Sequence, residues 1–273
     1  MNEYYVDYLK GAGKSKQTIK NYVCHINLAL NDIGKPDTEI TFLDMVKWES
    51  GLSSYSTSTI NIKVKAIKSY FAFLTQCKII KDNPTIGLSV PKIVNKKKPD
   101  PSAEMIRALI NIANSARDKA MLLLFASTGL RFEEAISITK SQYTQRKFDI
   151  IGKGNKVREI YINDEVKKLC DEYLKTRKDS SNLLFVSKNG KPVDNSNWCK
   201  KIKIYAKAAN FSCWKEISPH WLRHAFATQA SQMGVPVADI GFALGHSDYA
   251  KVTTRYIHTP QNKVRDIMNN ITF

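Results

Sequence analysis

The spacing of apolar residues divides the first part of the chain into helices. Between residues 16 and 33 the apolar positions recur at steps of three and four residues, and Gly34 follows. A similar run spans residues 57–77, and a shorter one spans residues 42–49. Because this spacing places apolar side chains on one face of a helix, residues 1–90 are predicted to form an all-helical domain.

The helical pattern gives way to a basic segment that is rich in proline. Residues 91–101 contain three prolines and the lysines Lys96, Lys97 and Lys98. Proline disfavours the helical conformation of the residue before it, so we expect a linker between two domains here, although an ordinary surface loop would have the same composition. A linker of this charge could also lie along a phosphate backbone.

Residues 102–273 are predicted to form a second domain that is largely helical. Ser102 is placed to begin a helix, and residues 117–127 have the continuous apolar character of a buried one. Within a tail helix at 261–273, apolar residues follow the i, i+3, i+4, i+7 pattern of one face.

A small β-sheet is expected inside this second domain. Two short β-branched runs, residues 148–152 and 157–162, flank a turn that contains glycine, which is typical of a β-hairpin. Residues 183–187 are predicted as a third strand, followed by a turn at Gly190. The expected fold class is mainly α with a small β-sheet, in two domains: helical residues 1–90 and mixed α+β residues 102–273.

The charge balance adds an expected partner. The 42 Lys and Arg residues outnumber 25 Asp and Glu, which gives a formal net charge of +17. Such an excess favours a polyanion, and DNA, RNA or an anionic membrane surface would all qualify, as would a surface charged only for solubility. The candidates for contact with a phosphate backbone are Lys16, Lys20, Lys65 and Lys68 on the predicted helices and Lys96, Lys97 and Lys98 in the linker.

The cysteines and the N-terminus exclude several other classes. The five cysteines are odd in number, widely spaced and without a Cys-x-x-Cys pair, so neither a disulfide framework nor a zinc site is expected. We expect no metal and no cofactor. The N-terminus does not resemble a signal peptide, and no apolar run approaches eighteen residues, so a cytoplasmic location is expected.

Four short segments contain candidate chemistry, and two of them carry a single cation. Arg131 follows an apolar helix and a glycine, where it needs an anionic partner; the alternative is a salt bridge to Glu133 or Glu134. Lys153 lies in the hairpin turn between two glycines, which allow a ligand to approach closely, although most turn lysines are only solvated.

The other two segments contain histidines. His220 and Arg223 share a face if their segment is helical, which is why His220 is favoured over His224. His246 follows the glycine that ends a predicted helix at 237–244, and Tyr256 comes ten residues later. A lone tyrosine is usually only an aromatic packing residue.

Taken together, these residues suit chemistry on a phosphodiester. Two guanidinium groups can bind the non-bridging oxygens, and histidines can donate hydrogen bonds or move protons near neutral pH. A lysine can protonate a leaving alkoxide, and a tyrosine can form a covalent intermediate.

The segments resemble those of the tyrosine recombinases, the phage integrase and Xer family, in order and approximate spacing. The segments are Thr128-Gly129-Leu130-Arg131, Gly152-Lys153-Gly154, His220-Trp221-Leu222-Arg223 and Leu244-Gly245-His246 with Tyr256. The resemblance implies that the catalytic residues are Arg131, Lys153, His220, Arg223, His246 and the nucleophile Tyr256, with Glu134 in a supporting role. The stretch before Tyr256 is one residue longer than the family pattern, so Tyr249 stays an alternative nucleophile.

The resemblance also implies an architecture and an activity. A helical, SAM-like core-binding domain, a linker and a catalytic domain would form a clamp on duplex DNA with an inverted-repeat core site. Cleavage would proceed through a 3′-phosphotyrosyl intermediate and a Holliday junction, without ATP or metal, in a tetramer on two sites. The tail would dock on a neighbouring protomer, or alternatively on its own domain, and an accessory DNA-binding protein or partner recombinase could take part.

Several biological roles and two rival functions stay open at this point. Integration or excision of a mobile element and resolution of dimers are both open, and the compact length is expected to fit simple Xer-like or resolvase systems somewhat better. A non-catalytic DNA-binding factor on the same scaffold, or an enzyme similar to type IB topoisomerases, are the alternatives.

Overall fold

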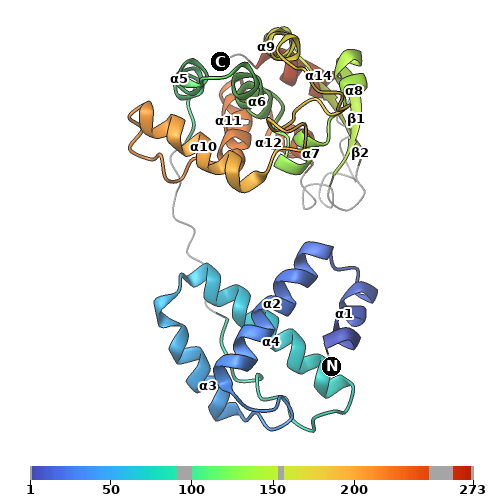
Figure 1. Cartoon of the computed structure of the whole chain (residues 1–273), viewed down its shortest axis with the longest axis vertical. Coiled ribbons are helices and arrows are strands. Elements are labelled where there is room, and N and C mark those ends of the chain that lie inside the picture. Colours follow the sequence, from blue (N-terminus) through green and yellow to red (C-terminus); the bar gives the residue numbers. More distant parts are fainter. Residues whose placement is uncertain (1, 91–99, 153–156, 246–260, 272–273) are drawn as a thin grey trace. The chain divides into compact units, whose positions relative to one another are not determined.

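The computed structural model describes residues 2–90, 100–152, 157–245 and 261–271. Its contacts divide the chain into two compact units, Met1–Lys97 and Lys98–Phe273, and each is treated by itself (Figure 1).

The first unit is built from helices alone in its described residues. The predicted helices are confirmed, and each begins at a residue whose side chain caps it: Ser15, Thr41 and Ser56 accept hydrogen bonds from the first turns. Helices α2 and α4 pack on each other, and Tyr5 of α1 meets Tyr70 of α4 edge to face. The elements are α1 (Asn2–Gly11), α2 (Lys16–Ile33), α3 (Phe42–Ser50), the 3-10 helix η1 (Gly51–Ser54) and α4 (Thr57–Gln76).

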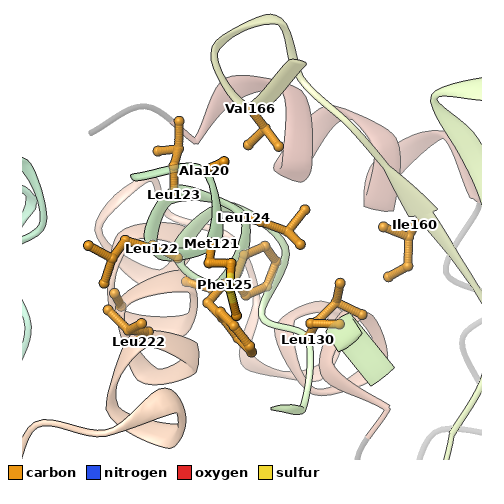
Figure 2. Close-up of a cluster of buried hydrophobic side chains, with 14 of the residues drawn as sticks. Ala120, Met121, Leu122, Leu123, Leu124, Phe125, Leu130, Ile160, Val166 and Leu222 are labelled. Carbon is orange, nitrogen blue, oxygen red and sulfur yellow. The ribbon is translucent and has the colours of Figure 1, made fainter. Parts of the chain in front are cut away.

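The second unit is arranged around one buried helix. Helix α6 is buried on nearly every side, as expected for a helix without a polar face, and it contacts α5, α9 and α11 (Figures 1 and 2). The helices of this unit are α5 (Ala103–Ile112), α6 (Ala116–Thr128), α7 (Phe132–Ile136), α8 (Lys140–Gln145), α9 (Asp164–Lys175), α10 (Asn195–Ala208), α11 (Pro219–Gln232), α12 (Val237–Leu244) and α14 (Gln261–Asn270). Because α6 ends at Gly129, the rigid core of this unit fixes the position of Arg131.

The β-hairpin is confirmed. Strands β1 (Lys147–Ile151) and β2 (Val157–Tyr161) pair antiparallel, with Phe148 opposite Ile160 and Ile150 opposite Arg158. In this register β2 turns Arg158 and Ile160 to the buried side of the hairpin.

The third strand predicted at residues 183–187 is wrong. The segment is buried, but its backbone makes only isolated bridges, Thr139 with Leu183 and Val186 with Pro192. Two bridges to different partners cannot make a continuous ladder, and proline has no N–H to extend one. The turn that follows is present, with Gly190 donating its N–H to the carbonyl of Ser187 at 3.0 Å.

Helix α14 buries the apolar face predicted for the tail. It contacts β2 and α12 of its own unit, and the N–H of Tyr161 donates to Met268 Sδ at 3.4 Å. Asn163 Nδ2 donates to the carbonyls of Met268 and Ile271 at the end of the helix, at 3.4 and 3.2 Å. The buried apolar residues of the tail are Val264, Ile267, Met268 and Ile271.

The expected fold class, mainly α with a small β-sheet, is confirmed. Among the residues that the structure describes, no helix is long and apolar enough to cross a membrane.

Candidate active site

Arg223 is a buried cation held by the ends of two helices. Ser218 caps α11 and Pro219 occupies its first turn, which confirms the helical segment expected there. Arg223 is only 3% exposed; Nη1 donates to the carbonyl of Gly129 at 2.6 Å and Nη2 to that of Leu244 at 2.5 Å. These carbonyls belong to the C-terminal ends of α6 and α12, where the helix dipole is negative.

The charge of Arg223 is poorly compensated. Burial, followed by the like charges of Arg131 and Arg158, lowers the pKa of its guanidinium to about 9. The described residues place no carboxylate within salt-bridge distance of Arg223. A desolvated guanidinium in such surroundings is a ready partner for an anion that arrives from outside the protein.

Arg131 is anchored beside Arg223 and stays partly open to solvent. Its side chain is 33% exposed; Nη1 donates to Glu134 Oε1 at 2.9 Å and Nη2 to the carbonyl of Gly245 at 3.1 Å. Its backbone N–H donates to Glu134 Oε2 at 2.7 Å. Because the carbonyls of Leu244 and Gly245 come from consecutive residues, their bonds to Arg223 and Arg131 bring the two guanidinium groups together.

Glu134 is the acidic centre of this cluster, and the salt bridge foreseen for Arg131 forms with it. Glu134 is 8% exposed and also accepts from Arg158, with Nη2 at 2.6 Å from Oε2 and Nη1 at 3.3 Å from Oε1. Burial alone would raise the pKa of Glu134, but the charge of Arg158 and the N–H groups of Arg131 hold it below its usual value. Two guanidinium groups therefore bind one carboxylate, and the nearby charge of Arg223 leaves the site net positive.

Sequence reasoning missed Arg158, although a signal was present. It lies two residues before the buried Ile160, so the period of a strand places both side chains on the inner face. A cation at an inward position of a short strand calls for a buried partner, which the structure supplies as Glu134.

His220 and His224 lie one turn apart on α11, before and after Arg223. Both are exposed, and their ring centroids are 4.9 Å apart in an edge-to-face arrangement. The two rings contact each other, and the sequence argument for His220 over His224 stays a prediction.

Three of the candidate catalytic residues lie outside the described residues: Lys153, His246 and Tyr256, as does the alternative nucleophile Tyr249. Their neighbours in the chain are described. Lys153 lies in the segment that joins β1 to β2, two strands whose last described pair is Ile151 with Val157. His246 directly follows Gly245, whose carbonyl accepts from Arg131.

The lysines expected to bind DNA differ in their surroundings. Lys16, Lys20 and Lys65 are exposed on α2 and α4, whereas Lys68 is half-buried and donates to the carbonyl of Leu88 at 2.7 Å. The linker lysines Lys96, Lys97 and Lys98 lie outside the described residues. In the described part of the chain, no three His, Cys, Asp or Glu side chains form a cluster that could hold a metal ion.

Comparisons with known proteins agree with this picture. The model of the phage integrase family matches residues 101–263. The tyrosine recombinase XerA of Pyrococcus horikoshii is 32% identical over 281 residues, which cover 96% of this chain and 93% of the relative. The tyrosine recombinase XerD of Haemophilus influenzae is 27% identical and covers 97% of this chain and 93% of the relative.

Solved structures show the same fold. A XerA recombinase has a TM-score of 0.51 at 25% identity, covering 100% of this chain and 94% of that one. A lambda integrase dimer bound to a core site has a TM-score of 0.74 at 15% identity, covering 92% of this chain and 95% of that one. The chain belongs to the phage integrase family and is a tyrosine recombinase, an enzyme that breaks and rejoins DNA.

Proposed function

We propose that Arg131 and Arg223 bind the scissile phosphate of a DNA core site and that Tyr256 attacks it. The observation that carries the proposal is the anchoring of both guanidinium groups on the adjacent carbonyls of Leu244 and Gly245, with no carboxylate of the described residues paired with Arg223. Donors fixed in this way need no reorganisation when negative charge develops on the phosphate.

The reaction we propose exchanges one phosphodiester for another. The phenolic oxygen of Tyr256 gives up its proton to solvent and forms a bond to phosphorus while the bond from phosphorus to the 5′-oxygen breaks, and Lys153 gives that oxygen a proton. His220 and His246 donate hydrogen bonds to the phosphate oxygens. The 5′-hydroxyl of the partner strand then returns a proton to Lys153 and attacks the 3′-phosphotyrosine, and the departing phenolate takes up a proton, which restores the DNA backbone and the tyrosine without ATP or metal.

The same proposal extends to the assembly. Solved lambda integrase structures include a dimer bound to a core site and a tetramer bound to a Holliday junction. For this chain we propose a tetramer on two inverted-repeat core sites, with a Holliday junction between the two strand exchanges. The tail helix α14 packs on its own unit in the single chain, so docking in trans would require its release from β2 when protomers assemble.

The nucleophile is tested by trapping the covalent intermediate. A library of random-sequence duplexes is enriched for those that bind the protein, and one enriched sequence is chosen as the selected duplex. It is rebuilt with a nick beside the cleavage position, so that the strand released by cleavage diffuses away and the covalent intermediate cannot be reversed. We expect Tyr256→Phe to bind this duplex as the unaltered protein does but to form no covalent adduct on a denaturing gel. The control Tyr249→Phe should form it. Adduct formation by Tyr256→Phe, or its loss in Tyr249→Phe alone, would assign the attack to another residue.

The role of Lys153 is tested with the leaving group. Lys153→Ala should lower the rate of cleavage of the selected duplex by roughly a hundredfold to ten-thousandfold, the range for loss of other general acids. A 5′-thio leaving group needs no proton, so a duplex that carries one at the scissile position should be cleaved at a near-normal rate. Failure of this substrate to restore cleavage would contradict the assignment.

A further inference from the structure

Arg158 occupies a position that is unfavourable for stability alone. Its side chain is 6% exposed, and Nε is buried without a hydrogen-bond partner in the described structure. Burial, followed in part by the charge of Arg131, lowers the pKa of its guanidinium despite the attraction of Glu134. Since well-packed apolar residues are often as stable as a buried ion pair, this cation calls for a reason other than stability.

The contacts of Arg158 fix the orientation of the Glu134 carboxylate. Its Nη2 and Nη1 bind both oxygens, Oε2 at 2.6 Å and Oε1 at 3.3 Å. The same two oxygens accept the backbone N–H and Nη1 of Arg131 at 2.7 and 2.9 Å. A carboxylate held by a guanidinium fork cannot rotate freely, so the place of Arg131 depends on the place of Arg158.

Arg158 also contacts the second group that holds Arg131. A Cβ atom added to Gly245 would lie 2.6 Å from Arg158 Nη1, so this guanidinium packs directly against the end of α12. The carbonyl of Gly245 accepts from Arg131 Nη2. The two groups that accept from the Arg131 side chain, the Glu134 carboxylate and the Gly245 carbonyl, therefore both belong to residues that Arg158 touches.

We propose that Arg158 is a positioning residue that fixes the guanidinium of Arg131 through Glu134 and Gly245. Because Arg158 is the second residue of β2, it also ties that guanidinium to the strand that follows the segment containing Lys153. This role rests on the proposed function, in which Arg131 binds the scissile phosphate. Arg158 itself touches no DNA in this scheme and acts only by holding the phosphate-binding group in place.

The test separates DNA binding from cleavage in Arg158→Met, which removes the charge and keeps much of the length. With the selected nicked duplex as probe, we expect its dissociation constant to stay within about threefold and its adduct rate at saturating DNA to fall roughly tenfold to a hundredfold, as for other misplaced groups. Arg158→Lys, which retains a cation, should recover part of the rate. It also serves as the second variant if Arg158→Met does not fold.

Arg177→Met is the matched control. Its side chain is 4% exposed, is paired with Asp179, and donates to the carbonyls of Ser181 and Leu184. Replacing Arg177 therefore removes a buried arginine that, among the described residues, has no partner in common with Arg131, Arg158 or Arg223. Its adduct rate should stay within about threefold of the unaltered protein. Equal rates for Arg158→Met and Arg177→Met at equal thermal stability would overturn the proposal.

A pH profile gives a readout that lost stability alone would not move. Among the described residues, the charged groups that face Glu134 are Arg131, Arg158 and Arg223. With Arg158 removed, the pKa of Glu134 rises, so the adduct rate of Arg158→Met should fall at a higher pH on the acid side than that of the unaltered protein. If Arg158 acts through Glu134, adding Arg158→Met to Glu134→Gln should lower the adduct rate little further. A double variant whose loss of rate equals the product of the two single losses would count against action through Glu134.

Two arms keep this proposal distinct from the proposed function. Arg131→Ala runs in the same assay, and normal cleavage by that variant would refute the phosphate-binding role whatever Arg158 does. If the library gives no duplex, NMR of the arginine side chains replaces cleavage. The guanidinium protons of Arg131, assigned with Arg131→Lys, should be resolved in the unaltered protein and lost by exchange in Arg158→Met; unchanged signals would overturn the proposal.

Discussion

The two units of this chain differ in their cations, because arginine is confined to one of them while lysine occurs in both. The first ninety residues contain lysine but no arginine, and all arginines lie in the second unit. Lys16, Lys20 and Lys65 are exposed, whereas Arg158 and Arg223 are buried and bonded in fixed orientations. Lysine is a hydrated point charge on a flexible stem, while arginine presents a rigid fork of donors. The first unit is thus suited to bind a polyanion through replaceable contacts, and the second to hold one phosphate in a defined geometry.

Replacing Arg223 with lysine is expected to break this comparison most severely. A lysine keeps the charge but cannot bridge the carbonyls of Gly129 and Leu244 and still present a donor to the phosphate. We expect Arg223→Lys to lower the adduct rate by roughly a hundredfold to a thousandfold, as for loss of one fixed donor in other enzymes. Single-turnover cleavage of the selected duplex measures it, with the exposed Arg107→Lys as control. A rate within about tenfold of normal would show that charge, and not geometry, is what this position supplies.

Local sequence rules predicted most of the helices because their signals are local. Ser15, Ser56 and Ser102 cap helices where the sequence placed their beginnings, and the glycine turn marked the hairpin. The third strand failed because apolar β-branched character also fits a buried segment that pairs only at isolated points.

The candidate site was predicted residue by residue, but its connections were not. Arg131 binds the carbonyl of Gly245, 114 residues away, and no local pattern encodes that contact. The local pattern left Glu134 as one of two acidic neighbours of Arg131, and the family resemblance selected it, but only the fold brings Arg158 to it from another element. The identity of charged residues can be read from a sequence, whereas their pairing depends on tertiary packing.

Two glycines sharpen the comparison because they end helices in the same way in the two units. Gly34 closes α2 with φ of 71° and Gly245 closes α12 with φ of 65°. A Cβ atom at Gly34 would meet open space, but one at Gly245 would collide with Arg158. Gly34→Ala should therefore cost only the left-handed backbone, about 1 kcal/mol, and Gly245→Ala about 2–3 kcal/mol, since the arginine must also move.

Thermal unfolding of the two glycine variants measures this difference, and the adduct assay extends it. Gly34→Ala should cleave the selected duplex normally. Gly245→Ala should cleave it slowly, because the displaced Arg158 carries Glu134 and Arg131 with it. Equal losses of stability with unchanged cleavage in both variants would mean that the end of α12 does not position the arginines.

The smallest effect is expected for the exposed lysines of the first unit. If Lys16, Lys20 and Lys65 bind phosphates, replacing all three with glutamine should weaken binding of the selected duplex and lower the slope of log K against log salt by about 0.9 for each phosphate that is no longer neutralised. The adduct rate at saturating DNA should not change, because these residues hold the duplex without shaping the reaction. Lys10→Gln on α1, which removes a lysine paired with Asp7, is the matched control and should leave the slope unaltered. A triple variant with a normal salt slope would show that these lysines contact solvent and not phosphates. A triple variant with a reduced adduct rate at saturating DNA would show that the first unit also helps to place the phosphate. The division between replaceable and fixed cations would then no longer hold.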